Sequence, residues 1–288
     1  MRSNPLLSFS VGGGTPPATS EMLRIYEDGQ AVGLIGNAWP EGQPQDEAGL
    51  YRMQLAPADL AAINQLLSDG HVPDLADEYG PVRADSGFRA LRLYSGGHEK
   101  RIRWGPFAKI PAPLRALQAR LREVLQLTRQ HPVQTARLAL RVPSGQVEVG
   151  RPFAVELELE NRGSRPIRML RPPDGAAKTT MLNLYAASGE AVRLDLPPPL
   201  EYFEYARAVS LDPVADSGIL GGTIELMPGE VRRLRATTPF SIEGPATYHL
   251  FAFALATIEV DLDGEMVGVD GLLIARPVAI VATDRPAR

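Results

Sequence analysis

Phe153-Ala-Val-Glu-Leu-Glu-Leu-Glu-Asn161 is the stretch that decides the fold of the second half of this chain. Its large apolar side chains alternate with glutamates, and successive side chains of a strand point to opposite faces. The stretch is therefore predicted to be a half-buried strand. Phe153, Val155, Leu157 and Leu159 are expected to face a core, and the glutamates to face water. The Asn161-Arg162-Gly163 segment that follows predicts a turn, because glycine accepts a positive φ.

Short apolar runs separated by turn residues continue from this strand to the end of the chain. The turn signals are Ser188-Gly189-Glu190, Met227-Pro228-Gly229-Glu230 and Asp263-Gly264. Upstream, Gln134 to Arg141 alternates in the same way, with Ala136, Leu138 and Leu140 predicted to face inward. This spacing of short strands and turns predicts an all-β immunoglobulin-like sandwich over residues 132–288.

The region before it mixes strands with helices. A hairpin is predicted across Glu27-Asp28-Gly29-Gln30, a third strand near Leu50, a helix over 57–68, a second hairpin over 88–104 and a helix over 111–130. Residues 1–20, with their glycine triplet and proline pair, are expected to be a lead-in. Residues 1–131 are therefore predicted to form an α+β domain, an antiparallel sheet with two helices on one face.

Length and composition agree with two globular domains and limit the function. The chain has 288 residues, is 44% hydrophobic and 22% charged, and carries a net charge of -4. This mild charge lacks the basic stripe of a nucleic-acid-binding protein. The absence of cysteine excludes disulfides, zinc-cysteine sites and thiol nucleophiles. No secretory signal and no run of about 20 apolar residues is evident. We expect a cytoplasmic protein without membrane or nucleic-acid partners, and the oligomeric state stays open.

No catalytic signature stands out in the sequence. The histidines, His71, His98, His131 and His249, are scattered and lack metal-binding spacing. No nucleophile elbow is present, and Asp261 to Glu265 matches only part of a calcium loop. Glu156, Glu158 and Glu160 are expected to lie about 7 Å apart on a solvated strand face, with Arg165, Arg168 and Arg171 as candidate partners. We therefore predict no catalytic residues, no cofactor and no metal site.

The long irregular segment from Pro197 to Gly222 is the main candidate for binding. Long loops are often functional, and this one places Tyr202, Phe203 and Tyr205 close together beside a proline run. These side chains are predicted to contact a protein partner. The alternative is that the rings cap the open end of the sandwich, because aromatic side chains are more often buried. Asp28 and Gly29, at the first hairpin, are the second predicted contact.

The second domain resembles the intracellular proteinase inhibitors of the BsuPI type, and other immunoglobulin-like sandwiches. The similarity rests on Val149-Gly-Arg-Pro-Phe153, on Asn161 to Ile167, on Leu226-Met-Pro-Gly-Glu230 and on Gly244-Pro-Ala-Thr-Tyr248. The first domain resembles emfourin-like inhibitors of thermolysin-type metalloproteases, through the Tyr26 to Gly29 hairpin and the helix start at Leu55 to Leu60. These resemblances imply protease inhibition, but no individual inhibitory residue.

The sequence thus supports one main hypothesis and two alternatives. The main hypothesis is a non-enzymatic protein-binding protein, in particular a protease inhibitor that occludes its target sterically through loops and hairpins. The first alternative is a structural scaffold, or an assembly or adaptor subunit. An unrecognised hydrolase, with catalytic groups converging from distant positions, ranks last.

Overall fold

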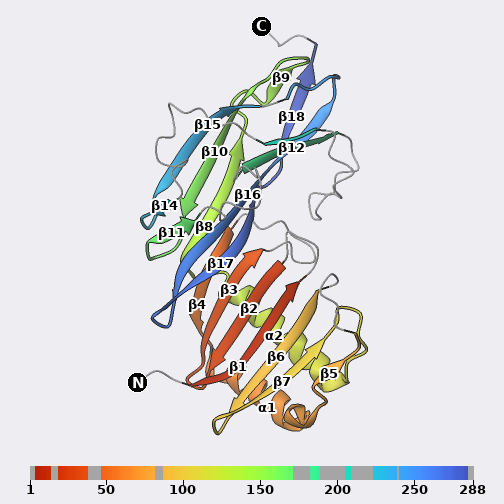
Figure 1. Cartoon of the computed structure of the whole chain (residues 1–288), viewed down its shortest axis with the longest axis vertical. Helices are drawn as coiled ribbons and strands as arrows, with labels where there is room; N and C mark the ends of the chain where they lie inside the picture. The colour runs from red at the N-terminus through yellow and green to blue at the C-terminus, as the bar shows by residue number, and fades with distance from the viewer. Residues whose placement is uncertain are drawn as a thin grey trace. The chain divides into compact units, whose positions relative to one another are not determined.

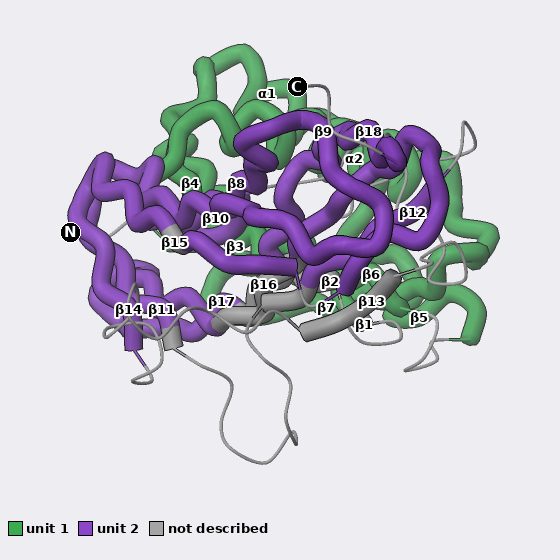
Figure 2. Tube along the Cα trace, turned by 90° about the horizontal axis from the view of Figure 1, so that it is seen from above, with its two compact units in different colours: residues 1–37, 50–133 green, residues 38–49, 134–288 purple. Residues whose placement is uncertain are grey.

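The computed structural model describes residues 4–13, 19–37, 47–81, 87–170, 182–188, 205–208, 223–238 and 240–284. Contacts divide the chain into unit 1, residues 1–37 and 50–133, and unit 2, residues 38–49 and 134–288 (Figure 2). The described part is mostly β-strand, with sandwich-like sheets and two α-helices (Figure 1). The predicted domains 1–131 and 132–288 stay a prediction. The predicted first domain includes residues 47–49, whereas the contacts group these residues with unit 2.

Unit 1 contains an antiparallel sheet in the order β7-β6-β1-β2-β3. The short strand β5 pairs in parallel with β7, and β4 spans the point where the chain passes from one unit to the other. The strands are β1 (Pro5–Gly13), β2 (Thr19–Tyr26), β3 (Gln30–Asn37), β4 (Glu47–Gln54), β5 (Glu78–Tyr79), β6 (Phe88–Ser95) and β7 (His98–Trp104). The expectation that residues 1–20 form a lead-in is wrong, because β1 is a central strand. Leu7 and Phe9 are fully buried and alternate with Ser8 and Ser10, a strand period hidden by the flanking glycines and prolines.

Two helices, α1 (Pro57–Asp69) and α2 (Ala112–Thr128), pack on one face of this sheet (Figure 1). The apolar stripe of α2 is buried as its spacing predicts, and consists of Leu114, Leu117, Leu121, Val124 and Leu125. At Gly33 of β3 the helix approaches closely, since an added Cβ would lie 3.0 Å from the Thr128 hydroxyl. An ion pair between Arg120 of α2 and Asp59 of α1, 2.5 Å long, ties the helices together.

A buried ion pair joins the end of α2 to the sheet. The Arg129 guanidinium lies 2.5 Å from the Glu21 carboxylate of β2, and these side chains are only 13% and 15% exposed. Burial raises the pKa of Glu21, an effect that the Arg129 and Arg122 charges partly offset. Burial likewise lowers the pKa of Arg129. Burial thus opposes the charged form of both groups, and their mutual attraction offsets part of that cost.

Unit 2 is built from two antiparallel sheets. One has the order β15-β10-β8 and the other contains β14-β11-β16-β17. The long β16 also pairs with β12 and β18, and β18 pairs in parallel with β9. The strands are β8 (Pro132–Arg141), β9 (Gln146–Glu148), β10 (Ala154–Asn161), β11 (Ile167–Leu170), β12 (Leu182–Ser188), β13 (Tyr205–Ala208), β14 (Thr223–Leu226), β15 (Val231–Thr237), β16 (Thr247–Leu262), β17 (Glu265–Ile274) and β18 (Val278–Thr283).

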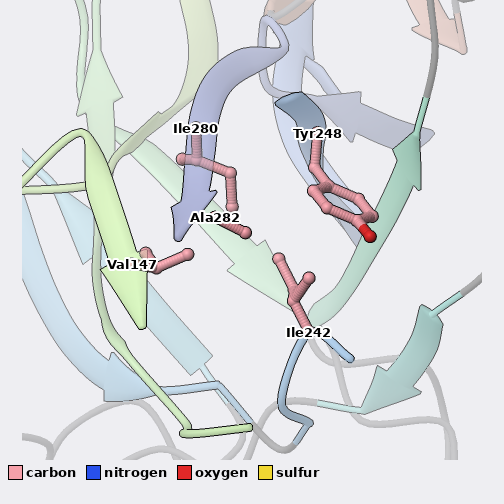
Figure 3. Packing of buried hydrophobic residues seen from close by; sticks show 5 residues of the cluster. All are labelled: Val147, Ile242, Tyr248, Ile280 and Ala282. Atoms are coloured by element: carbon pink, nitrogen blue, oxygen red, sulfur yellow. The ribbon is translucent and has the colours of Figure 1, made fainter. Parts of the chain in front are cut away.

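The inner faces of these sheets form the core of unit 2. Val155, Leu157 and Leu159 of β10 are buried as predicted, and so are the inward residues of β8, Ala136, Leu138 and Leu140. Further along, a second cluster gathers side chains from β9, β16, β18 and the segment before β16 (Figure 3). Its members are Val147, Ile242, Tyr248, Ile280 and Ala282.

Asn161, at the end of β10, is fully buried and holds two turns of unit 2. Its side-chain amide donates to Arg165 O at 2.9 Å and to Leu226 O at 3.0 Å, while its side-chain oxygen accepts from Gly163 N–H at 2.9 Å. Its backbone bonds Glu230 O and Gly229 N–H. One side chain therefore joins the turn after β10 to the turn where the chain passes from β14 to β15.

Asn161→Ala should destabilise unit 2 by about 2–4 kcal/mol, because it leaves buried carbonyl and amide groups without partners. Urea denaturation followed by circular dichroism measures the loss. Asn64→Ala is the control, since Asn64 is an exposed asparagine of α1 and its replacement should change stability by no more than about 0.5 kcal/mol. Equal stability of the two variants would show that the Asn161 network is not needed.

Arg129→Met should cost about 3 kcal/mol at neutral pH, because it strands the buried Glu21 carboxylate without its cation. The double variant Glu21→Leu/Arg129→Met should stay within about 1 kcal/mol of wild type. Burial raises the pKa of Glu21, so the Arg129→Met variant should be most stable below the ordinary glutamate pKa. Its free energy of unfolding should fall as pH rises through the raised pKa. Urea titrations at several pH values test this; a pH-independent deficit would contradict it.

Candidate functional site

The aromatic residues predicted to bind a partner lie largely outside the described residues. Tyr202 and Phe203 fall in an undescribed segment, and only the backbone of Tyr205 is described. Tyr205 begins β13, opposite Ala186 of β12. The proposed binding role of these three residues stays a prediction.

The predicted contact at Asp28 and Gly29 lies at the tip of the β2–β3 hairpin. Gly29 has φ +83°, is buried, and its carbonyl accepts from Leu55 N–H at 2.9 Å. The Asp28 carboxylate is exposed and accepts from Gln30 N–H at 3.0 Å, while Asp28 O accepts from the Gln54 side chain at 2.7 Å. The Asp28 side chain is thus open to solvent, whereas Gly29 serves the join between the hairpin and β4.

The three glutamates of β10 form an ionic layer rather than a solvated face. Glu158 is only 12% exposed and lies between Arg233 of β15, at 2.9 Å, and Arg141 of β8, at 3.1 Å. Glu156 pairs with Arg235 at 2.9 Å, and Glu160 with Arg137 at 3.6 Å.

The partners of this layer are therefore not those that the sequence suggests. Arg165 pairs with Asp261, and Arg168 pairs with Glu225 and Glu259. Arg171 lies outside the described residues. The expectation for Arg165 and Arg168 was wrong because they follow β10 in the sequence but do not lie beside it. The strands on either side of β10 are β15 and β8, and they supply the arginines.

The described residues contain no group of three or more histidine, aspartate or glutamate side chains placed to hold a metal ion. Within the same part of the chain, neither helix has the length and apolar character needed to cross a membrane. His249 has a buried Nδ1 without a hydrogen-bond partner, but it stands alone on β16 between strands that contribute Ala187 and Ala279. Since its cross-strand neighbours are alanines, His249 is not placed beside a nucleophile or an orienting carboxylate at these register positions.

An exposed aromatic side chain on a fixed turn is the most distinctive surface feature of unit 1. Phe107 is 93% exposed, more than any other large hydrophobic side chain among the described residues. It lies in the turn of residues 105–108, the Phe107 turn, which connects β7 to α2. Ala108 N–H donates to Gly105 O at 3.2 Å and closes this turn.

Trp104 anchors the start of the Phe107 turn. It is 2% exposed, stacks on Phe9 of β1 with ring centroids 6.2 Å apart, and donates from its indole to Gln118 of α2 at 3.0 Å. It is also the register partner of Tyr79 in the β5–β7 pair. The residue that precedes the turn is therefore fixed from the sheet, from the helix and from β5.

Close backbone packing braces the turn itself. A Cβ added to Gly105 would lie 2.7 Å from Pro81 O, so only glycine fits beside this segment. Gly80 has φ +68°, and an added Cβ would lie 3.1 Å from the Ala108 side chain. Downstream, Arg115 of α2 donates from its side chain to Ile110 O at 3.2 Å. The turn is held at both ends, yet it leaves its phenylalanine in water.

This arrangement suits insertion of an apolar side chain into a partner's pocket. Burying a phenylalanine contributes about 2–3 kcal/mol, and little entropy is lost when the backbone is already ordered. Ion pairs flank the strand that leads to the turn, Arg103 with Glu78 and Lys100 with Asp77. Sequence reasoning overlooked Phe107, although an aromatic residue directly after Gly105-Pro106 is a usable signal, because Gly-Pro pairs mark exposed turns.

Comparison with known proteins yields no family. No known protein family matches the chain, and no curated protein matches it. Among solved structures, a CARDB domain of a Pyrococcus furiosus protein in complex with di-metal ions is 12% identical, with a TM-score of 0.26, covering 52% of this chain and 94% of that chain. A human ASH/PapD-like domain of CEP192 is 13% identical, with a TM-score of 0.23, covering 52% and 87%. These similarities are too weak to assign a family or an activity.

Gly105→Ala should destabilise unit 1 by about 1–3 kcal/mol, because its Cβ would displace the backbone at Pro81. Hydrogen exchange at residues 105–108 should accelerate as the brace loosens. Gly244→Ala is a matched control, since its added Cβ would approach no closer than 3.7 Å to another residue. If both alanines were equally well tolerated, the Phe107 turn would not be braced as described.

Proposed function

We propose that this chain is a non-enzymatic protein-binding protein whose main contact is the Phe107 turn. The observation that carries the proposal is the 93% exposure of Phe107 on a turn that is held on both sides. A large aromatic side chain left in water is unfavourable for the free protein, and hot spots of protein interfaces are enriched in aromatic anchors of this kind.

Protease inhibition is the specific form of binding that we propose. It is supported by the resemblance of both halves of the sequence to protease inhibitors. The closed Phe107 turn favours occlusion over cleavage, because a peptide that lies in a cleft as an added strand must be extended. The turn bends back through the bond from Ala108 N–H to Gly105 O. Tyr202, Phe203, Tyr205, Asp28 and Gly29 remain proposed secondary contacts.

A structural scaffold or assembly subunit is the second candidate. Two exposed methionines of unit 2 favour it, since flexible apolar side chains suit adaptable binding surfaces. Met227 is 61% exposed in the turn between β14 and β15, and Met266 is 60% exposed near the tip between β16 and β17. A scaffold would use these positions together with the Phe107 turn to hold more than one protein.

The fold of each unit and the cellular location are part of the same proposal. We propose that unit 1 is an α+β domain and unit 2 an immunoglobulin-like sandwich, and that the protein acts in the cytoplasm. The fold proposal is supported by the helices on one face of the unit 1 sheet and by the paired sheets of unit 2. The location is supported by the lack of cysteine, which suits a reducing compartment.

Phe107→Ala should weaken partner binding by at least about tenfold while leaving the fold intact, because it removes an exposed anchor and no buried contact. Partners are captured from the native host's lysate on the full chain and identified by mass spectrometry. Affinities of the purified partner are then measured for wild type, for Phe107→Ala and for the triple variant Tyr202→Ala/Phe203→Ala/Tyr205→Ala. Val281→Ala, which truncates an exposed apolar side chain of β18, is the control.

A parallel assay against a thermolysin-type and a subtilisin-type protease tests whether the chain inhibits proteases. Near-stoichiometric inhibition that Phe107→Ala weakens is the expected result. Capture of other proteins without inhibition, together with self-association in light scattering, would favour the scaffold. Unchanged affinity of Phe107→Ala for every captured partner would overturn the role of the Phe107 turn.

A further inference from the structure

The β15 strand of unit 2 forms an open sheet edge. It pairs along its whole length with β10, from Val231 opposite Glu160 to Thr237 opposite Ala154 (Figure 1). Within the described residues no strand pairs with its other side. An open edge presents unpaired N–H and C=O groups to which another chain can be added.

The register shows which backbone groups of β15 face outward. Thr238 N–H donates to Phe153 O at 2.8 Å, and Asn161 N–H donates to Glu230 O at 3.0 Å. These contacts define hydrogen-bonded pairs at both ends of the ladder, and such pairs alternate along antiparallel strands. Residues 232, 234 and 236 therefore bond to β10. The N–H and C=O groups of Val231, Arg233, Arg235 and Thr237 point away from the sheet.

The same alternate residues carry the exposed side chains of β15. The side chains of Arg233 and Arg235 are 69% and 82% exposed, and Val231 is 41% exposed. Outward-facing backbone groups and solvent-facing guanidinium groups thus come from the same positions. The repeat is two residues, or about 7 Å, which is the repeat of an extended peptide.

Glutamates beneath the guanidinium groups hold these arginines in place. Arg233 lies 2.9 Å from Glu158, and Arg235 lies 2.9 Å from Glu156. Arg141 of β8, 64% exposed, shares Glu158 from the other side. The carboxylates form the lower layer, since Glu156 and Glu158 are only 24% and 12% exposed, and the cations form the upper one. An approaching chain therefore meets positive charge first.

We propose that the β15 edge binds an extended acidic segment of a partner protein, which adds to the sheet as a further strand. Its backbone would bond the outward groups of residues 231, 233, 235 and 237, and its carboxylates would lie over Arg233 and Arg235. Addition of a strand supplies affinity through the main chain, and alternate side chains supply specificity. A second copy of β15 is disfavoured, because arginines would then face arginines. This surface is independent of the Phe107 turn.

Labelled peptides of alternating glutamate and valine, about eight residues long to match a strand, are the direct probe. Their binding to the full chain is followed by fluorescence anisotropy at about 50 mM and about 500 mM salt. Two peptides serve as controls, one with lysine in place of glutamate and one with alternate amides N-methylated. The first keeps the strand and reverses the charge. The second keeps the charge and cannot pair along its edge.

Arg233→Gln/Arg235→Gln should weaken binding of the glutamate peptide by about tenfold or more, and added salt should weaken binding to wild type. Arg151→Gln/Arg168→Gln is the matched control, because it removes two exposed, ion-paired arginines from other parts of unit 2. Arg233→Pro should weaken binding beyond Arg233→Gln, since proline removes an outward N–H but no bond to β10. Circular dichroism verifies that each variant is folded.

Amide exchange locates the contact. The peptide should slow exchange at residues 231, 233, 235 and 237, while residues 232, 234 and 236 are protected before it is added. If the N-methylated peptide bound as tightly as the unmodified glutamate peptide, the surface would bind polyanions without adding a strand. That result would overturn the proposal. Binding that is unchanged in Arg233→Gln/Arg235→Gln, or no binding by any peptide, would do the same.

Discussion

The arrangement of unit 2 depends on the buried side chain of Asn161. A sandwich needs its chain to cross from one sheet to the other, and at such a crossing backbone groups leave one ladder before they enter the next. Asn161 satisfies groups on both sides of the crossing from β14 to β15, through Leu226 O and through its own backbone bonds to residues 229 and 230. Beyond this turn, β15 enters the sheet beside β10, its strand partner within the described residues.

Glu230 reinforces the same turn from the solvent side. Its carboxylate accepts from Met227 N–H at 2.8 Å, and this bond lowers its pKa, with a further contribution from Arg232. The Met-Pro-Gly-Glu turn is therefore stabilised by one buried amide and one exposed carboxylate. These contacts give a physical reason for the glutamate that ends this turn.

Charge plays two different roles in the two units. In unit 1 the Glu21–Arg129 pair is shielded from water, and burial opposes both charges. In unit 2 the β10 carboxylates lie under arginines that remain open to solvent, so the layer neutralises the glutamates and still presents guanidinium groups outward. The first arrangement joins α2 to the sheet. The second leaves a charged surface available for contacts.

Alternation and helical spacing in the sequence determined the local structure. The β10 strand and the buried stripe of α2 follow from them, because a strand repeats every two residues and a helix every 3.6. The hairpin at Asp28-Gly29 follows from its turn residues. The central strand β1 escaped detection, since its glycines and prolines obscure a short alternation around Leu7 and Phe9. The binding sites predicted at Tyr202, Phe203 and Tyr205 remain expectations.

Only the tertiary structure decided what depends on residues far apart in the chain. It placed Arg141 and Arg233 on either side of Glu158, and it set Pro81 against Gly105, which leaves Phe107 exposed on a braced turn. It also packed Gly49 against Gln134, whose carbonyl would lie 2.1 Å from an added Cβ. Local sequence carries the period of each element, whereas strand pairing and exposure depend on which elements become neighbours.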